Sequence, residues 1–176
     1  MTGRVTLFAD GGSRGNPGPA AGGAVLVAED GTVLDEVAIY LGRATNNVAE
    51  WQGLVRGLEA AVERGVRRLA VRLDSELVVR QLTGVYRVKH ADLIPLHAKA
   101  RRLLAKFEET DIRHVPRAQN KLADAAVNRC LDEAAQAGAD GIGAISPGAD
   151  GIGAISPGAD GIGAIRRGGP TGTTEP

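Results

Sequence analysis

The chain places four acidic residues at positions where strands end or helices begin, so that their carboxylates can meet in one crevice. Asp10 and Asp74 each end an apolar, strand-like run. Glu50 lies early in a predicted helix, and Asp124 lies at the opening of the last predicted helix. Carboxylates that share a crevice repel one another, so such a cluster is tolerable only where metal ions neutralise it. The four acids therefore predict a site for two-metal phosphodiester cleavage.

Each of these residues also has an ordinary structural explanation. An Asp that follows a strand most often lies in a turn or caps a helix. Asp124 could serve only to complement the dipole of its helix, and Asn46 and Asn47 could simply cap the first long helix. We interpret Trp51 as a core residue and Cys130 as a buried helix residue. The metal-site interpretation depends on the acids occurring together.

The pattern of apolar residues predicts the elements that must position the acids. Strands are predicted over Val5–Asp10, Gly23–Ala28, Glu36–Leu41, Leu69–Asp74 and Ile112–Val115, and helices over Asn47–Arg64, Glu76–Leu82, Leu93–Phe107 and Lys121–Ala137. Asp30-Gly31 predicts a hairpin between the second and third strands. Hairpin-connected strands followed by alternating strands and helices indicate an α/β fold with a mixed sheet.

The connection between the first and fourth strands explains how Asp10 and Asp74 could meet. A right-handed crossover through the first long helix lays the fourth strand parallel to the first. Both acids then stand at carboxyl ends of parallel strands, which is where open α/β sheets bind their ligands.

The C-terminal part of the chain is of a different kind. Residues 139–165 repeat the sequence ADGIGAISPG with a period of ten. Each unit carries little large apolar surface, which is too little to offset the entropy of ordering the chain. We therefore predict two parts, a folded domain over residues 1–138 and a disordered low-complexity tail over residues 139–176. Because Asp recurs at a fixed period, the alternative is a short solenoid or calcium-binding repeat.

Composition adds weaker constraints. The formal net charge is zero, but the tail holds four acids and two bases, so residues 1–138 carry 19 bases against 17 acids. If four of those acids bind metal, the remaining surface is basic and suits a polyanion. Cys130 is the only cysteine, and the sequence has no apolar run long enough for a membrane span. We expect a cytoplasmic monomer without a membrane partner.

Four short blocks fall in the order of the signature blocks of a known family. They are Asp10–Pro19 (DGGSRGNPGP), Thr45–Glu50 (TNNVAE), Asp74–Ser75 and Asn120–Asp124 (NKLAD). In these blocks, which span most of residues 1–138, the chain resembles type 1 ribonuclease H. The resemblance implies a ribonuclease H-like fold, a five-stranded mixed sheet flanked by helices. It also implies a metal-dependent endonuclease that hydrolyses the RNA strand of RNA–DNA hybrids.

The resemblance assigns roles to particular residues. It places the catalytic, metal-binding acids on Asp10, Glu50, Asp74 and Asp124. Oxygen ligands without His or Cys fit two Mg²⁺ ions, with Mn²⁺ as a substitute. One ion would activate the attacking water and the other would stabilise the leaving 3′ oxygen, giving 5′-phosphate and 3′-hydroxyl ends. The substrate contacts it implies are Gly11, Gly12, Asn16, Asn46, Asn47 and Ser75, with Arg43 and Thr45 in a pocket for a phosphate of the DNA strand.

The chain departs from many family members in two places. Where many of them carry a His before the last helix, this sequence has Arg117. A guanidinium stays protonated, so Arg117 cannot be a general base, but it can contact the scissile phosphate as a catalytic group. A basic handle after the helix Glu76–Leu82 is missing, which makes the chain a short form of the family and predicts weaker hybrid binding.

Three other functions remain open from the sequence. A non-catalytic nucleic-acid-binding module on the same fold would normally lack part of the acid set. An exonuclease or resolvase would share clustered acids but not the Asp10–Pro19 block. The hypothesis of a calcium-binding protein depends on the repeats alone.

Overall fold

The computed structural model describes residues 3–140 and 164–168. Its strands are β1 (Arg4–Ser13), β2 (Gly18–Val27), β3 (Val33–Ala44), β4 (Arg68–Leu73), β5 (Glu109–His114) and β6 (Ala164–Gly168). Its helices are α1 (Asn46–Glu63), α2 (Glu76–Leu82), α3 (Ile94–Leu104) and α4 (Lys121–Asp140), with a 3₁₀ turn, η1 (Arg117–Gln119), before α4. The predicted α/β class, the five predicted strands and the four predicted helices are confirmed.

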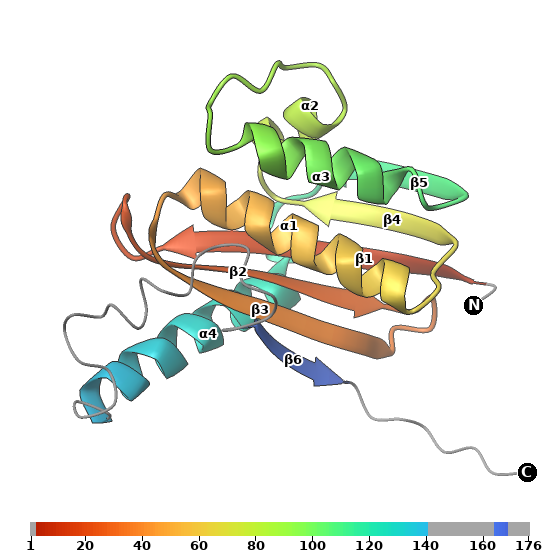
Figure 1. Ribbon diagram of the computed structural model, residues 1–176. Coiled ribbons are helices and arrows are strands. Elements are labelled where there is room, and N and C mark those ends of the chain that lie inside the picture. Colours follow the sequence, from red (N-terminus) through yellow and green to blue (C-terminus); the bar gives the residue numbers. More distant parts are fainter. Residues whose placement is uncertain (1–2, 141–163, 169–176) are drawn as a thin grey trace, which may run out of the picture.

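The strands form one mixed sheet in the order β5-β4-β1-β2-β3-β6 (Figure 1). β1 pairs in parallel with β4, and β4 pairs in parallel with β5, whereas β1, β2 and β3 are joined by antiparallel pairing. The predicted hairpin between β2 and β3 is present, with Gly31 at a φ of 89°. The crossover through α1 therefore brings the carboxyl ends of β1 and β4 together, as the sequence predicted.

The sixth strand was not predicted. β6 comes from residues assigned to the disordered tail, and it pairs antiparallel with the outer edge of β3 between Asp35 and Ile39. An edge strand offers unpaired backbone groups, so pairing there does not require the apolar side chains that the repeats lack. Residues 139 and 140 extend α4. Residues 141–163 and 169–176 lie outside the described residues, and for them the disordered tail and the calcium-binding alternative remain predictions.

The two faces of the sheet carry separate cores, because α1 and α4 cover opposite faces (Figure 1). Buried residues on the α1 side include Leu7, Ala24, Trp51, Leu54, Leu58 and Val71. The smaller cluster on the α4 side consists of Ala21, Ala38, Val127, Cys130 and Leu131. Trp51 is completely buried, as expected of a core residue, and its Nε1 donates to Gln81 Oε1 over 3.3 Å. Burial raises the pKa of the Cys130 thiol to about 11, which fits an inert core cysteine.

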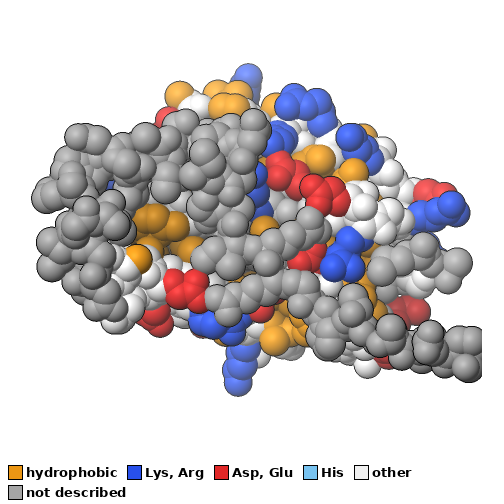
Figure 2. Space-filling model, turned by 60° about the horizontal axis from the view of Figure 1, so that its bottom comes forward, with side chains coloured by type: hydrophobic (Ala, Val, Ile, Leu, Met, Phe, Trp, Pro, Cys, Tyr) orange, Lys and Arg blue, Asp and Glu red, His pale blue; other side chains and the backbone are white. Residues whose placement is uncertain are grey.

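The outer surface mixes both signs of charge. On the face drawn in Figure 2, basic and acidic side chains are interspersed wherever the grey residues do not cover it. Within the part of the chain that the structure describes, no helix has the length and apolarity needed to cross a membrane.

Three glycines let the backbone of α1 lie directly against the backbone of the sheet. A Cβ added to Gly11 would lie 2.2 Å from the backbone nitrogen of Glu50, and one added to Gly22 would lie 2.5 Å from that of Gly53. A Cβ on Gly53 would lie 2.2 Å from the carbonyl oxygen of Asp10. No side chain fits at these positions unless the helix moves away. The glycines therefore set the distance between the segments that carry Asp10 and Glu50.

This contact predicts a difference between two substitutions in the same helix. Gly53→Ala places a methyl group against backbone, whereas Gly57→Ala places it against the side chains of Ala24 and Leu7. Both replacements gain equally in helix propensity. We expect Gly53→Ala to lower the free energy of unfolding by about 1–3 kcal/mol and Gly57→Ala to lower it less. Urea unfolding of both variants checks this, and an equal or reversed order would contradict the assigned role of Gly53.

Candidate active site

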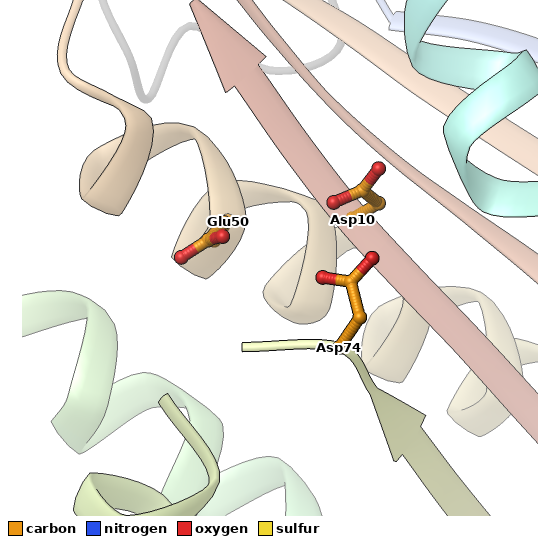
Figure 3. A group of neighbouring side chains, drawn as sticks. All are labelled: Asp10, Glu50 and Asp74. Atoms are coloured by element: carbon orange, nitrogen blue, oxygen red, sulfur yellow. The ribbon is translucent and has the colours of Figure 1, made fainter. Parts of the chain in front are cut away.

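Three of the four predicted acids meet at the carboxyl ends of β1 and β4. Asp10 belongs to β1, Asp74 follows the last residue of β4, and Glu50 projects from the second turn of α1. One carboxylate oxygen from each lies within 4.8 Å of the others. Figure 3 shows the three carboxylates arranged around a common space, with that of Asp74 directed toward Asp10. The ligand atoms are all carboxylate oxygens, and such hard donors suit Mg²⁺, Ca²⁺ or Mn²⁺.

Asp124 and Arg117 lie in the same pocket but outside that closest group. The pocket has a volume of about 270 Å³, and its lining includes all four acids, Arg117, Gly11, Gly12 and Asn46. Asp124 stands in the first turn of α4, and Arg117 opens the 3₁₀ turn that precedes it. The structure thus brings the four predicted acids and the predicted arginine to one site, contributed by two strand ends, two helices and the 3₁₀ turn before α4.

The same pocket contains residues that were not singled out from the sequence. They are Ser13, Arg14, Val127, Asn128 and Leu131. Val127, Asn128 and Leu131 come three, four and seven residues after Asp124, so they share one face of α4 with it. That spacing could have identified them once Asp124 was assigned to the site. Arg14 forms an ion pair with Asp132.

Mutual repulsion and burial perturb the titration of two of the acids. The pKa of Asp10 is raised from 3.8 to about 7, first by burial and then by the negative charges of Asp74, Asp124 and Glu50, while a hydrogen bond from Gly11 opposes the shift. Burial likewise raises the pKa of Glu50 from 4.5 to about 7, with a contribution from Asp74. A cation bound among the carboxylates would oppose both shifts.

Two groups in the protein already oppose the shift at Glu50. A hydrogen bond from the Ser75 side chain and the positive charge of Arg117 both lower the pKa of Glu50. The Ser75 hydroxyl also caps α2, accepting from the backbone nitrogen of Val78 over 3.3 Å. Ser75 was predicted to contact substrate, and here it contacts Glu50 and the start of α2.

The predicted substrate contacts lie beside the acids, at the start of α1. The backbone nitrogen of Asn46 donates to Asn16 Oδ1 over 3.2 Å, and that of Ser13 donates to Asn46 Oδ1 over 2.8 Å. Thr45 caps α1 through its hydroxyl. These amide oxygens tie the β1–β2 turn to α1. A second pocket, of about 410 Å³, is lined by Asn16, Thr45, Asn46 and Asn47 and also by His90.

Arg43 lies in a third and larger pocket. This pocket has a volume of about 670 Å³, and its lining includes Arg43, Thr45, Gln52, Asp92 and Pro95. Its lining also includes residues of α3 and of the segment between α2 and α3. That segment, residues 83–93, contains no further helix, in agreement with the missing handle. Its Tyr86 stacks against Arg80, with the guanidinium carbon 5.3 Å from the ring centroid.

Comparisons with known proteins agree with this architecture. The profile of a family described as reverse transcriptase-like matches residues 8–130. A crystal structure of RNase H1 from Halobacterium salinarum is 49% identical, with a TM-score of 0.71, over 74% of this chain and 99% of that chain. LC11-RNase H1 in complex with an RNA/DNA hybrid is 41% identical, with a TM-score of 0.70, over 74% of this chain and 98% of that chain. The chain belongs to the type 1 ribonuclease H family.

A third relative indicates how such a domain can occur in a longer protein. The N-terminal RNase H domain of a Mycobacterium tuberculosis protein is 48% identical, with a TM-score of 0.74, over 78% of this chain and 99% of that chain. The curated form of that protein is called bifunctional, and this chain is 50% identical to it over 77% of its own length. The present chain spans 38% of that relative's length. The similarity is therefore to the ribonuclease H domain of that longer protein.

The raised pKa values predict how Asp10→Asn changes stability with pH in the absence of metal. The folded protein holds protons on Asp10 and Glu50 up to pH about 7, whereas the unfolded chain loses them near pH 4. The free energy of unfolding of the wild type should therefore fall as pH rises from 4 to 7. Asp10→Asn removes one of these groups, so we expect it to be more stable than the wild type at pH 8, by on the order of 1–3 kcal/mol.

Urea unfolding with a chelator at pH 4 and pH 8 checks this prediction. The stabilising effect should vanish at pH 4, where the wild-type carboxyls are protonated. Glu108→Gln is the control, since it removes an acid from an exposed ion pair with Arg67. If Asp10→Asn had the same effect at both pH values, repulsion within the acid cluster would not be the cause.

Proposed function

We propose that this ribonuclease H domain is a metal-dependent endonuclease that hydrolyses the RNA strand of RNA–DNA hybrids. The observation that carries the proposal is the meeting of Asp10, Glu50 and Asp74 within 4.8 Å at the carboxyl ends of two parallel strands. Membership of the family supports the same activity, as does the similarity to an RNase H1 whose structure holds an RNA/DNA hybrid. A non-catalytic nucleic-acid-binding module is the alternative that experiment must exclude.

Asp10, Glu50, Asp74 and Asp124 would hold two Mg²⁺ ions, for which Mn²⁺ can substitute. When bound, the ions would supply an activated water and charge stabilisation of the leaving 3′ oxygen, giving 5′-phosphate and 3′-hydroxyl ends. Arg117 lines the same pocket, where its fixed positive charge can hold the scissile phosphate. Because the guanidinium of Arg117 is already protonated, this side chain would not be the general base that deprotonates the attacking water.

Selection of the hybrid would depend on residues around the start of α1. Gly11, Gly12 and Asn46 lie in the acid pocket, and Asn16 and Asn47 lie in the pocket beside it. A side-chain amide whose oxygen already accepts a hydrogen bond still has a free NH₂ group, which can donate to a 2′-hydroxyl of the RNA strand.

Arg43 and Thr45 would bind a phosphate of the DNA strand in the third pocket. The residues that line this pocket include one cation, Arg43, and the hydroxyl of Thr45. A charge-assisted hydrogen bond from Arg43 to a phosphate oxygen would fix the position of the second strand.

Cleavage assays test the proposed activity directly. With Mg²⁺ or Mn²⁺, we expect cuts inside the end-labelled RNA strand of an RNA–DNA hybrid, and none in matched RNA or DNA duplexes or with a chelator. Loss of a residue that only supports a metal ligand typically costs 10–100-fold in activity. Asp74→Asn alters a ligand itself, so we expect its rate to fall by more than about 100-fold.

Glu108→Gln serves again as the control, because this exposed acid directly precedes β5 and does not line the acid pocket. It should cleave like the wild type. Hybrid binding by a folded wild type that cuts nothing would favour the binding module. Cutting of the DNA duplex would favour another nuclease on this fold.

We further propose that residues 1–138 form the catalytic unit, acting as a cytoplasmic monomer, and that the tail is dispensable for cleavage. β6 pairs with β3 between Asp35 and Ile39, and none of these residues lines the acid pocket.

A chain that ends after Gly138 should therefore keep the cleavage rate of the full chain to within about twofold, with a small loss of stability from the unpaired edge of β3. The rate constant under single-turnover conditions and the melting temperature of both chains check this. A tenfold loss of rate in a folded truncated protein would assign the tail a part in catalysis.

A further inference from the structure

A buried side chain that lies in a signature block but was given no role there joins the segments carrying the acids. Asn120 lies between η1 and α4 and is completely buried. Its backbone nitrogen donates to the carbonyl of Arg117 over 3.0 Å, and its carbonyl accepts from the backbone nitrogen of Asp124 over 3.1 Å. Asn120 thus connects the turn that carries Arg117 to the helical turn that carries Asp124.

The side-chain amide of Asn120 extends this connection to both strands. Its Nδ2 donates to the carbonyl oxygen of Ala9 over 2.9 Å and to Asp74 Oδ2 over 3.2 Å. Ala9 directly precedes Asp10, and Asp74 directly follows β4. One NH₂ group therefore uses both of its protons to bridge the ends of β1 and β4.

The orientation of this amide is determined by its acceptors. A rotated amide would place Oδ1 against Ala9 O and Asp74 Oδ2, and neither of these atoms can donate while Asp74 is ionised. In the observed orientation, Oδ1 is buried and has no hydrogen-bond partner among the described residues. An unpaired buried oxygen is unfavourable, so the two bonds from Nδ2 hold the amide in place against that cost.

We propose that Asn120 is a positioning residue that fixes the Asp74 carboxylate for metal binding. The inference rests on the metal site of the proposed function. With Oδ2 held by Nδ2, the Asp74 carboxylate cannot rotate freely, and its second oxygen keeps one direction relative to Asp10 and Glu50. A fixed carboxylate loses less freedom when an ion binds, which raises the affinity of the site.

Two variants of Asn120 separate this role from a purely structural one. Asn120→Leu keeps a similar volume and Asn120→Ala leaves a cavity, but both remove the two donor protons. We expect the Mn²⁺ dissociation constant, measured by calorimetry on the folded protein without substrate, to rise 10–100-fold in both. The Mg²⁺ concentration for half-maximal cleavage should rise in parallel, while hybrid affinity in chelator stays unchanged.

Gln81→Leu is the matched control. Gln81 is another buried side-chain amide, whose Oε1 accepts from Trp51 Nε1, and it does not line the acid pocket. Gln81→Leu should lower the melting temperature and leave the Mn²⁺ dissociation constant within twofold of the wild type.

The outcomes separate this inference from the proposed function. If the wild type bound no Mn²⁺, the metal site itself would be wrong. If the wild type bound Mn²⁺ and a folded Asn120 variant bound it equally well, only the positioning role would be wrong. Should both variants fail to fold, NMR spectra of the ¹⁵N-labelled wild type still decide. If Asn120 holds the metal ligand Asp74, binding of Mg²⁺ must change the chemical shifts of the Asn120 side-chain NH₂ group.

Discussion

The site depends on the close approach of α1 to the sheet. The backbone of Gly53 meets the carbonyl of Asp10, and Gly11 meets the peptide between Ala49 and Glu50, at distances where no side chain fits. A helix packed on a sheet through ordinary side chains would stand farther away. Glycine on both surfaces removes that spacing, so a carboxylate from a helix can join carboxylates from two strand ends. The position of Glu50 follows from this backbone contact.

The closeness that the glycines permit has an electrostatic cost. Buried carboxylates with like-charged neighbours hold their protons up to a pH near 7, so the fold without metal is strained at the pH where the site would work. The chain offsets part of this cost with contacts around the cluster. Ser75 and Arg117 lower the pKa of Glu50, and Asn120 donates to Asp74. A bound cation would supply the remainder, which couples metal binding to folding stability.

Much of this could be predicted from the sequence because the informative signals are local. Asp10 and Asp74 end apolar runs, and Asp30-Gly31 marks a hairpin, so the parallel direction of the fourth strand and the meeting of these two acids followed from general rules of chain connection. Asn120 was visible only as part of a motif, since its bonds to Ala9 and Asp74 span 111 and 46 residues of sequence. β6 could not be predicted because an edge strand pairs through backbone groups, which the side-chain pattern does not record. Ser75 resembled a substrate contact, while its partner, Glu50, belongs to another element.

The start of α1 links catalysis to substrate selection. Asn46 lines both the acid pocket and the second pocket, and Thr45 and Val48 line both the second and the third. The three pockets therefore adjoin one another across the first turn of the helix that carries Glu50. Any shift of α1 would change the distance from the acids to the Arg43 pocket and the geometry of the acid cluster together. A substrate that fits all three pockets would stabilise the helix position in which the acids are correctly spaced, so recognition and metal geometry would share one structural element.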